Sequence, residues 1–548
     1  MPVARWSLVV FKFSSCVFIL VLVSVASFAG TRFQPTTTLT VETSNNTSGA
    51  DQFAGQTNGN IAPGNVSKVS LQTLLYPGST AKIYAHLVPW FGFGDHVEVG
   101  YTSSDVLQIQ KQVTDMISRG IDGVIIDWYG RGVFHHNFVE YDQGVQSLML
   151  EAEKHDGFTF ALMEDVGALK ACAAGKCNPT DALIEDLNYA QRTYQGSPAY
   201  MQYKGRPVVF FFGMGAYNID WHRVKSRVAG NPIFIFRNAG AFRHEDSDGG
   251  YAWVEPRARG DKGNDEHKSK AAGSSLNLPD MGYLDGYYYS ATHHPDDLSL
   301  GAGYKGFDDS IALWGRNRFI DQQCGRAWLA SIAEAGKYYS ETTQMSGIQL
   351  VTWNDYEEGS EFETGIDNCV NITAGVHGSQ IRWNVEGDES TLDHFTVFVS
   401  QDGENLMPLA DVAIGQHLLD LGRFGLDPAD YTVFVKAVGK PSLTNKMSRG
   451  ARMTIAPGQS NSNSPEFALS VTPDTAVASS QITASISGLD NNFLTSSVID
   501  FGDGTIVNGQ LASTHVYRLA GSYTIIATVT ANGASTTRIA SITINEHP

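Results

Sequence analysis

The sequence predicts an α/β protein in which a (β/α)8 barrel is followed by two small all-β sandwiches. Between residues 80 and 372, apolar runs typical of β-strands alternate with amphipathic helical stretches, a pattern that favours a parallel sheet. After about residue 370, short runs alternate apolar and polar positions between turns that contain Gly and Asp, which is typical of antiparallel sandwiches. A chain of 548 residues is also long enough for two to four domains.

The N-terminus has the pattern of a secretory signal, residues 1–29. Arg5 and Lys12 give a positive start, residues 16–26 are apolar, and residues 27–29 supply a small-x-small cleavage pattern. The apolar run is short for a membrane span, although an uncleaved anchor is the alternative. Residues 30–79 are rich in Thr, Ser, Asn and Gly, so we expect a disordered linker there. We therefore expect a secreted or cell-surface protein without a membrane span after cleavage.

Eight apolar runs are the expected strands of the barrel. They cover residues 82–89, 123–128, 159–163, 207–212, 232–236, 251–254, 298–304 and 347–353. A ninth run, residues 287–290, has no assigned place. Helical patterns occupy residues 106–118, 143–154 and 326–338. An open doubly wound sheet is the alternative, but the Gly-x-Gly-x-x-Gly turn that binds phosphate in such folds is missing after the first run.

Composition and motifs exclude several function classes. The net charge of -19 repels nucleic acid phosphates, and no Lys/Arg stripe offsets it, so no nucleic acid partner is expected. The pairs His135-His136 and His293-His294 lack the spacing that places two metal ligands on one helix face. A Gly-x-Ser-x-Gly nucleophile motif is also missing. We expect a monomer that needs no metal and no cofactor.

Cleavage of the signal removes Cys16 and leaves four of the five cysteines. In an oxidising compartment the natural pairing is Cys172 with Cys177 and Cys324 with Cys369, one of three possible connectivities. A zinc site is the alternative, but the Cys-x4-Cys spacing has no matching second pair.

The run at residues 348–351 ends in a group of polar and aromatic residues that includes Asp355 and Glu358. Their carboxyls are separated by three positions, close enough to act on one small group, and two carboxyls that flank a bond are the minimum equipment for glycoside hydrolysis. We assign Glu358 as general acid and Asp355 as base or assisting carboxylate, with exchanged roles as an alternative. The alternative interpretation of these residues is a solvated acidic loop without a catalytic role.

Other candidates follow from their places at strand ends, because the carboxyl ends of barrel strands converge on one face. Acids there bind sugar hydroxyls or cap helices, and aromatic rings stack on sugars or pack the end of the barrel. The substrate-binding candidates are Asp127, Trp128, Tyr129, Glu164, His86, Trp90, Trp253, Trp353 and Asn354. For Asp308 and Asp309 a capping role is at least as plausible as substrate contact.

The C-terminal segment, residues 466–548, resembles the PKD domain. Residues 498–505, Val-Ile-Asp-Phe-Gly-Asp-Gly-Thr, and the His-x-Tyr and Gly-x-Tyr elements of residues 515–524 carry the resemblance. It implies a spacer or glycan-contacting module in which Tyr517 and Tyr523 pack the sandwich. A Ser/Asn/Pro linker, residues 457–465, precedes it. Residues 375–456 look like a fibronectin type III-type sandwich on pattern alone.

The barrel resembles glycoside hydrolase families 71 and 99, the α-1,3-glucanases and endo-α-mannosidases. Residues 83–86, 120–130 and 353–358 carry the resemblance, the last as Trp-Asn-Asp-Tyr-Glu-Glu. It implies hydrolysis of an α-linked polysaccharide, an α-glucan such as α-1,3-glucan or an α-mannan, by Asp355 and Glu358, and Glu357 falls on an unmatched position.

Two departures bear on the mechanism. Family 99 has Glu at the position of Asp355 and Trp at that of Tyr356. In that family the first carboxylate is the base for the attack of the substrate's own 2-hydroxyl. Asp is one methylene shorter, so we expect Asp355 to serve a water or positioning role, as the family 71 pattern suggests. A non-catalytic glycan-binding or adhesive protein on a hydrolase-like barrel is the alternative function.

Overall fold

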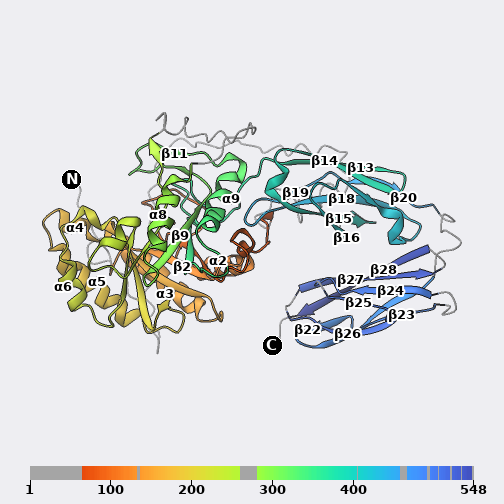
Figure 1. Ribbon diagram of the computed structural model, residues 1–548, viewed down its shortest axis with the longest axis horizontal. Helices are drawn as coiled ribbons and strands as arrows, with labels where there is room; N and C mark the ends of the chain where they lie inside the picture. Colours follow the sequence, from red (N-terminus) through yellow and green to blue (C-terminus); the bar gives the residue numbers. More distant parts are fainter. Residues whose placement is uncertain are drawn as a thin grey trace, which may run out of the picture. The chain divides into compact units, whose positions relative to one another are not determined.

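The computed structural model describes residues 65–131, 136–258, 280–403, 405–456, 466–489, 494–503, 505–518, 521–531 and 534–545. The expected signal and the expected linker at residues 457–465 lie outside the described residues. In Figure 1 the α-helices belong to the orange-to-green part of the chain, whereas its cyan and blue parts consist mainly of strands.

A closed barrel of eight parallel strands forms the first part of the protein. Strand β1 pairs with both β2 and β12, and pairing of β3 with β5 completes the ring. Each predicted run overlaps one barrel strand, so the barrel is confirmed and the open sheet is excluded. The strands are β1 (Lys82–Leu87), β2 (Gly123–Trp128), β3 (Thr159–Asp165), β5 (Arg206–Phe212), β6 (Ile233–Arg237), β7 (Gly249–Tyr251), β9 (Leu298–Tyr304) and β12 (Gly347–Val351).

Amphipathic helices follow most of these strands, as local sequence dictates. In α2, Asp105 accepts a hydrogen bond from the N–H of Leu107 at the N-terminus, and Ile109, Val113 and Met116 are buried along one face. The α-helices are α2 (Val106–Ser118), α3 (His136–Ala152), α4 (Lys170–Ala173), α5 (Pro179–Thr193), α6 (Trp221–Arg227), α8 (Gly282–Thr292) and α9 (Arg326–Ala333). The unplaced run at residues 287–290 lies in α8, because a short apolar run fits a buried helix as well as a strand.

The prediction of a disordered linker at residues 30–79 is wrong for its last part, residues 65–79. This segment contains the 3₁₀ helix η2 (Leu71–Leu74), and Leu71 and Leu75 belong to the barrel's hydrophobic core. The N–H of Leu71 donates to the carbonyl of Arg119, at the end of α2. A few apolar residues in a polar segment are therefore enough to fix it on the barrel.

The next part of the chain forms two antiparallel sheets that enclose their own core. One holds β13 (Asn371–His377), β14 (Gln380–Glu386) and β17 (Leu418–Asp420). The other holds β15 (Leu392–Ser400), β16 (Met407–Ala413), β18 (Asp430–Gly439), β19 (Lys446–Met447) and β20 (Ala451–Thr454). Because β13 begins at Asn371 and Ile372 lies in this core, the sandwich starts before the expected residue 375.

The last part also consists of two sheets. One has β21 (Ala468–Thr472), β23 (Gln481–Ser487) and β26 (Ala512–Val516), and the other has β22 (Thr475–Val477), β24 (Leu494–Asp500), β25 (Ile506–Asn508), β27 (Gly521–Ala531) and β28 (Ala534–Asn545). Tyr517 is buried, stacks on Tyr523 with ring centroids 4.0 Å apart, and donates its hydroxyl to the carbonyl of Phe501. The two tyrosines thus pack this sandwich as predicted.

The cysteines pair as predicted, Cys172 with Cys177 and Cys324 with Cys369. The first bond closes a short loop between α4 and α5, and the second joins the segment before α9 to the segment before β13. In the part of the chain that the structure describes, no helix is long and apolar enough to cross a membrane.

Candidate active site

Asp355 and Glu358 lie together just beyond the carboxyl end of β12. Asp355 Oδ1 accepts hydrogen bonds from the backbone N–H groups of Glu357 (3.1 Å) and Glu358 (2.9 Å), while its own N–H donates to Thr352 Oγ1. These bonds wind the chain into a tight turn. Asp355 is 3% exposed, whereas 16% of the Glu358 side chain is exposed. Glu358 is therefore the more accessible of the two carboxyls.

Burial and mutual charge set the protonation of this pair. Burial raises the pKa of Asp355 well above its ordinary value, and the charge of Glu358 raises it further. Burial also raises the pKa of Glu358, but the hydrogen bond from Trp314 and the charge of Arg318 act against that rise. The indole Nε1 of Trp314 lies 3.2 Å from Glu358 Oε1, and an Arg318 nitrogen lies 3.9 Å from the same oxygen.

Two further acids interact with the pair from neighbouring strands. Asp127, the sequence candidate on β2, accepts a hydrogen bond from the hydroxyl of Tyr129 at 3.0 Å. Its pKa is raised well above normal, first by burial and next by the charge of Asp165. Asp165, the last residue of β3, has its pKa raised to about 7, mainly by burial and further by the charge of Glu358.

Sequence reasoning missed Asp165. The apolar run of β3 ends at Met163, and Glu164 was the acid that followed it directly. Successive side chains of a strand point to opposite faces. Met163 is the register partner of Asp127, so Asp165, two residues later, shares the inner face with Asp127. The register of β2 and β3, combined with the alternation of side chains along each strand, is the signal that identifies Asp165.

Aromatic rings lie beside the acids. Trp90 stacks on His96 with ring centroids 4.7 Å apart, and Trp314 meets both rings edge to face. His96 Nδ1 is 2.6 Å from Glu357 Oε2, so Glu357 holds this ring in place. Neither His96 nor Trp314 carried a usable sequence signal, because both lie in loops outside the strands.

His86 and Trp253 lie inside the barrel below this group. Their rings contact edge to face at 4.7 Å, and His86 Nδ1 is 3.1 Å from Gln349 Nε2. Burial lowers the pKa of His86 to about 3, so the ring is neutral. Both residues are almost fully buried, and their expected contact with substrate stays a prediction.

Four sequence candidates occupy positions at odds with the expected contact with substrate. Trp128 is buried, stacks on Tyr189 of α5 and donates its Nε1 to Asp142 of α3. Glu164, its register partner, is fully buried, and Asp186 of α5 is the largest charge acting on it. Strand alternation turns both side chains outward, to the layer between barrel and helices.

The other two, Trp353 and Asn354, anchor the acid-bearing turn. Trp353 is completely buried against Phe362 and the guanidinium of Arg119. The Asn354 amide donates to the carbonyl of Val88 and accepts from its N–H, each at 2.9 Å, and so ties the turn to the end of β1. Packing and hydrogen bonding account for both residues.

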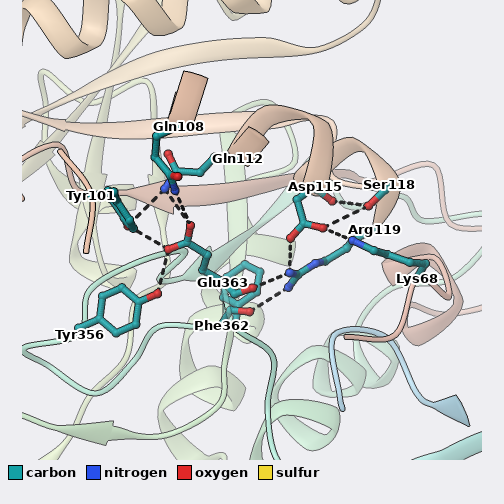
Figure 2. A network of polar contacts seen from close by, with 10 residues as sticks. All are labelled: Lys68, Tyr101, Gln108, Gln112, Asp115, Ser118, Arg119, Tyr356, Phe362 and Glu363. Atoms are coloured by element: carbon teal, nitrogen blue, oxygen red, sulfur yellow. Dashed lines mark hydrogen bonds and ion pairs between the residues drawn. The ribbon is translucent and has the colours of Figure 1, made fainter. Parts of the chain in front are cut away.

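A polar network supports the turn from behind (Figure 2). Glu363 accepts hydrogen bonds from the hydroxyls of Tyr101 and Tyr356, each at 2.9 Å, and from the amide of Gln112 at 3.0 Å. The buried Arg119 donates to the carbonyl of Phe362 at 2.9 Å and also pairs with Asp115. Phe362 and Glu363, which follow the acid-bearing turn, are therefore held in place by this network.

No group of three or more His, Cys, Asp or Glu side chains that could hold a metal ion occurs within the described ranges. The site consists of Asp127, Asp165, Asp355 and Glu358 beside Trp90, His96, Trp314 and Tyr129. Such a set can donate and accept protons, bind hydroxyl groups and contact apolar ring faces.

Comparison with known proteins identifies one domain. No curated protein matches the chain. Among solved structures, it is similar to the GH99 endo-alpha-mannosidase from Bacteroides thetaiotaomicron, with 17% identity, 51% of this chain and 87% of that chain covered, and a TM-score of 0.37. It is also similar to the PKD1 domain of Vibrio anguillarum Epp, with 26% identity, 15% and 96% covered, and a TM-score of 0.14. The family model of the PKD domain matches residues 469–544, and this segment is a PKD domain.

Proposed function

We propose that the chain is a secreted glycoside hydrolase that cleaves an α-linked polysaccharide, either an α-glucan such as α-1,3-glucan or an α-mannan. The observation that carries the proposal is the pair of the buried Asp355 and the partly exposed Glu358 at the end of a barrel strand, with Asp127 and Asp165 acting on it electrostatically. The α-linkage rests on the sequence resemblance of residues 353–358. Two disulfides and the signal-like N-terminus support secretion.

In the proposed reaction Glu358 gives its proton to the glycosidic oxygen as the bond from that oxygen to C1 breaks. Burial raises the pKa of Glu358, which favours the protonated form that a general acid needs, while Trp314 and Arg318 limit that rise. A water oxygen bonds to C1 while Asp355, in its ionised form, takes the proton of that water. The backbone N–H groups of Glu357 and Glu358, which donate to Asp355, favour this ionised form. Asp127, held by Tyr129, and Asp165 accept hydrogen bonds from sugar hydroxyls.

Hydrolysis assays on a panel of α-glucans and α-mannans test the proposal. We expect Glu358→Gln and Asp355→Asn each to lower kcat by about 10²–10⁴-fold, the usual size of general acid–base catalysis. Glu357→Gln is the matched control. It keeps an oxygen for His96 and should be mild. Loss of activity in Glu357→Gln with an intact Glu358→Gln would contradict the assignment.

Two further measurements bear on the proposal. Glycan binding without hydrolysis by the wild type would favour the non-catalytic alternative. NMR of the first-formed product tests the role of Asp355, since a water activated by Asp355 gives inversion. A product that keeps the α-configuration would instead support the 2-hydroxyl route.

A further inference from the structure

The hairpin after β9 is tied firmly to the acid-bearing turn. Strands β10 (Phe307–Asp308) and β11 (Arg318–Ile320) pair, and the loop between them covers residues 309–317. The N–H of Asp308 donates to the carbonyl of Glu358 at 2.7 Å. The buried Asp309 accepts from the backbone N–H groups of Arg316 and Arg318 and from Arg318 Nε. The loop thus has a defined shape and a defined position relative to Glu358.

Trp314 projects from this loop onto the acid. One edge of its indole contacts Glu358 through the N–H, and the ring meets Trp90 (5.8 Å between centroids) and His96 (5.6 Å) edge to face. The residue is nevertheless 41% exposed. A tryptophan with a hydrogen bond on one edge and this much open surface has ring area left for a ligand.

Two apolar residues of the same loop, Ile311 and Leu313, are also exposed. Leu313 is 88% exposed and Ile311 is 63% exposed. Neither side chain is assigned a contact with substrate, so this part of the loop supplies a control position for Trp314.

We propose that Trp314 positions the Glu358 carboxyl through its indole N–H and stacks on the sugar ring of the leaving group. This inference rests on the proposed function. A general acid protonates the oxygen that joins the two sugars and stays with the leaving sugar. A ring in hydrogen-bond contact with that acid therefore lies next to the leaving sugar, and a flat indole face complements the apolar face of a sugar ring.

The test uses the full chain, with two variants and two substrates. Trp314→Phe keeps a ring but removes the N–H donor, whereas Trp314→Ala removes both. Leu313→Ala is the matched control, because Leu313 is the more exposed neighbour in the same loop. One substrate is an α-linked oligosaccharide that the wild type cleaves. The other is the α-glycosyl fluoride of the same sugar, whose leaving group has no ring and needs little protonation.

For the oligosaccharide we expect Trp314→Phe to lower kcat by about tenfold, the effect of one hydrogen bond to a charged or reacting group. The basic limb of its pH–rate profile should move to higher pH, because the hydrogen bond from Trp314 lowers the pKa of Glu358. Trp314→Ala should in addition raise KM about 2- to 10-fold through the lost ring contact. Hydrolysis of the fluoride by both variants, and of both substrates by Leu313→Ala, should stay within about twofold of wild type.

Unchanged pH profiles in Trp314→Phe would overturn the positioning role. An equal rise of KM for fluoride and oligosaccharide in Trp314→Ala would overturn the leaving-group contact. Both of these results are obtained with a wild type that is active. A wild type that cleaves no α-glycan overturns the proposed function and this inference with it.

Discussion

Two adjacent acids on β3, Glu164 and Asp165, show that a carboxyl has very different surroundings on the two faces of the barrel. Asp165 lies on the inner face, where Asp127 and Glu358 act on it and the N–H of Gly167 donates to it at 2.6 Å. Glu164 lies in the layer between strands and helices, and neither of its oxygens has a hydrogen-bond partner among the described residues. The first environment gathers carboxyls that can act on a ligand, whereas the second buries one carboxyl among packed side chains.

The largest expected difference between the two faces is in activity. We expect Asp165→Asn to lower kcat/KM by about 10- to 100-fold, because the variant replaces one carboxyl oxygen, proposed to accept a hydrogen bond from a sugar hydroxyl, with an amide that donates. Glu164→Gln should stay within about twofold of wild type, since strand alternation turns its side chain away from the inner face. Steady-state kinetics on the α-glycan that the wild type cleaves measure both. A larger loss in Glu164→Gln than in Asp165→Asn would show that the faces are assigned the wrong way round.

How far the sequence predicts this site depends on the kind of interaction. The buried strands are visible as runs such as residues 123–128, because a parallel strand covered on both faces is continuously apolar. Asp355 and Glu358 are visible for the related reason that polar residues end such a run abruptly. Asp127 and Trp128 are neighbours whose side chains point to opposite faces of the strand. A strand that is buried on both faces has no apolar–polar alternation, so the sequence does not show which of the two side chains points inward.

The loops are harder still to predict. Trp314 and His96 come from loops separated by more than two hundred positions, and tertiary contacts alone bring them to Glu357 and Glu358. The supporting residue Glu363 likewise finds Tyr101 across the chain. Local sequence patterns carry no information about such pairs, whereas the disulfides were predictable because four cysteines allow few pairings.

The second expected effect is on stability, and it depends on pH. Burial raises the pKa of Glu164 in the folded protein well above its ordinary value. A raised folded-state pKa gives stability that is complete at low pH and is lost as the pH rises through that pKa, because the unfolded chain releases the proton more easily. Glu164→Gln removes this penalty, so its Tm should exceed that of the wild type increasingly as the pH rises.

Thermal unfolding followed by circular dichroism between about pH 5 and 8 measures this difference. A constant offset between the two proteins across that range would mean that Glu164 is ionised in the folded state, and the buried environment assigned to it would then be wrong.

The smallest expected effects compare Trp90, beside the acids, with Trp128, in the outer layer. The Nε1 of Trp128 donates to Asp142 at 3.0 Å, whereas the Nε1 of Trp90 has no hydrogen-bond partner among the described residues. Trp128→Phe should therefore lower the free energy of unfolding by about 1–2 kcal/mol and leave kcat/KM within about twofold of wild type. Trp90→Phe removes no hydrogen bond, so it should lower the free energy of unfolding less than Trp128→Phe does. It should raise KM, because it changes the ring beside His96 and Trp314. Urea unfolding and steady-state kinetics on both variants measure this contrast. A raised KM in Trp128→Phe at unchanged stability would place that indole against substrate and restore the role that the sequence suggested for it.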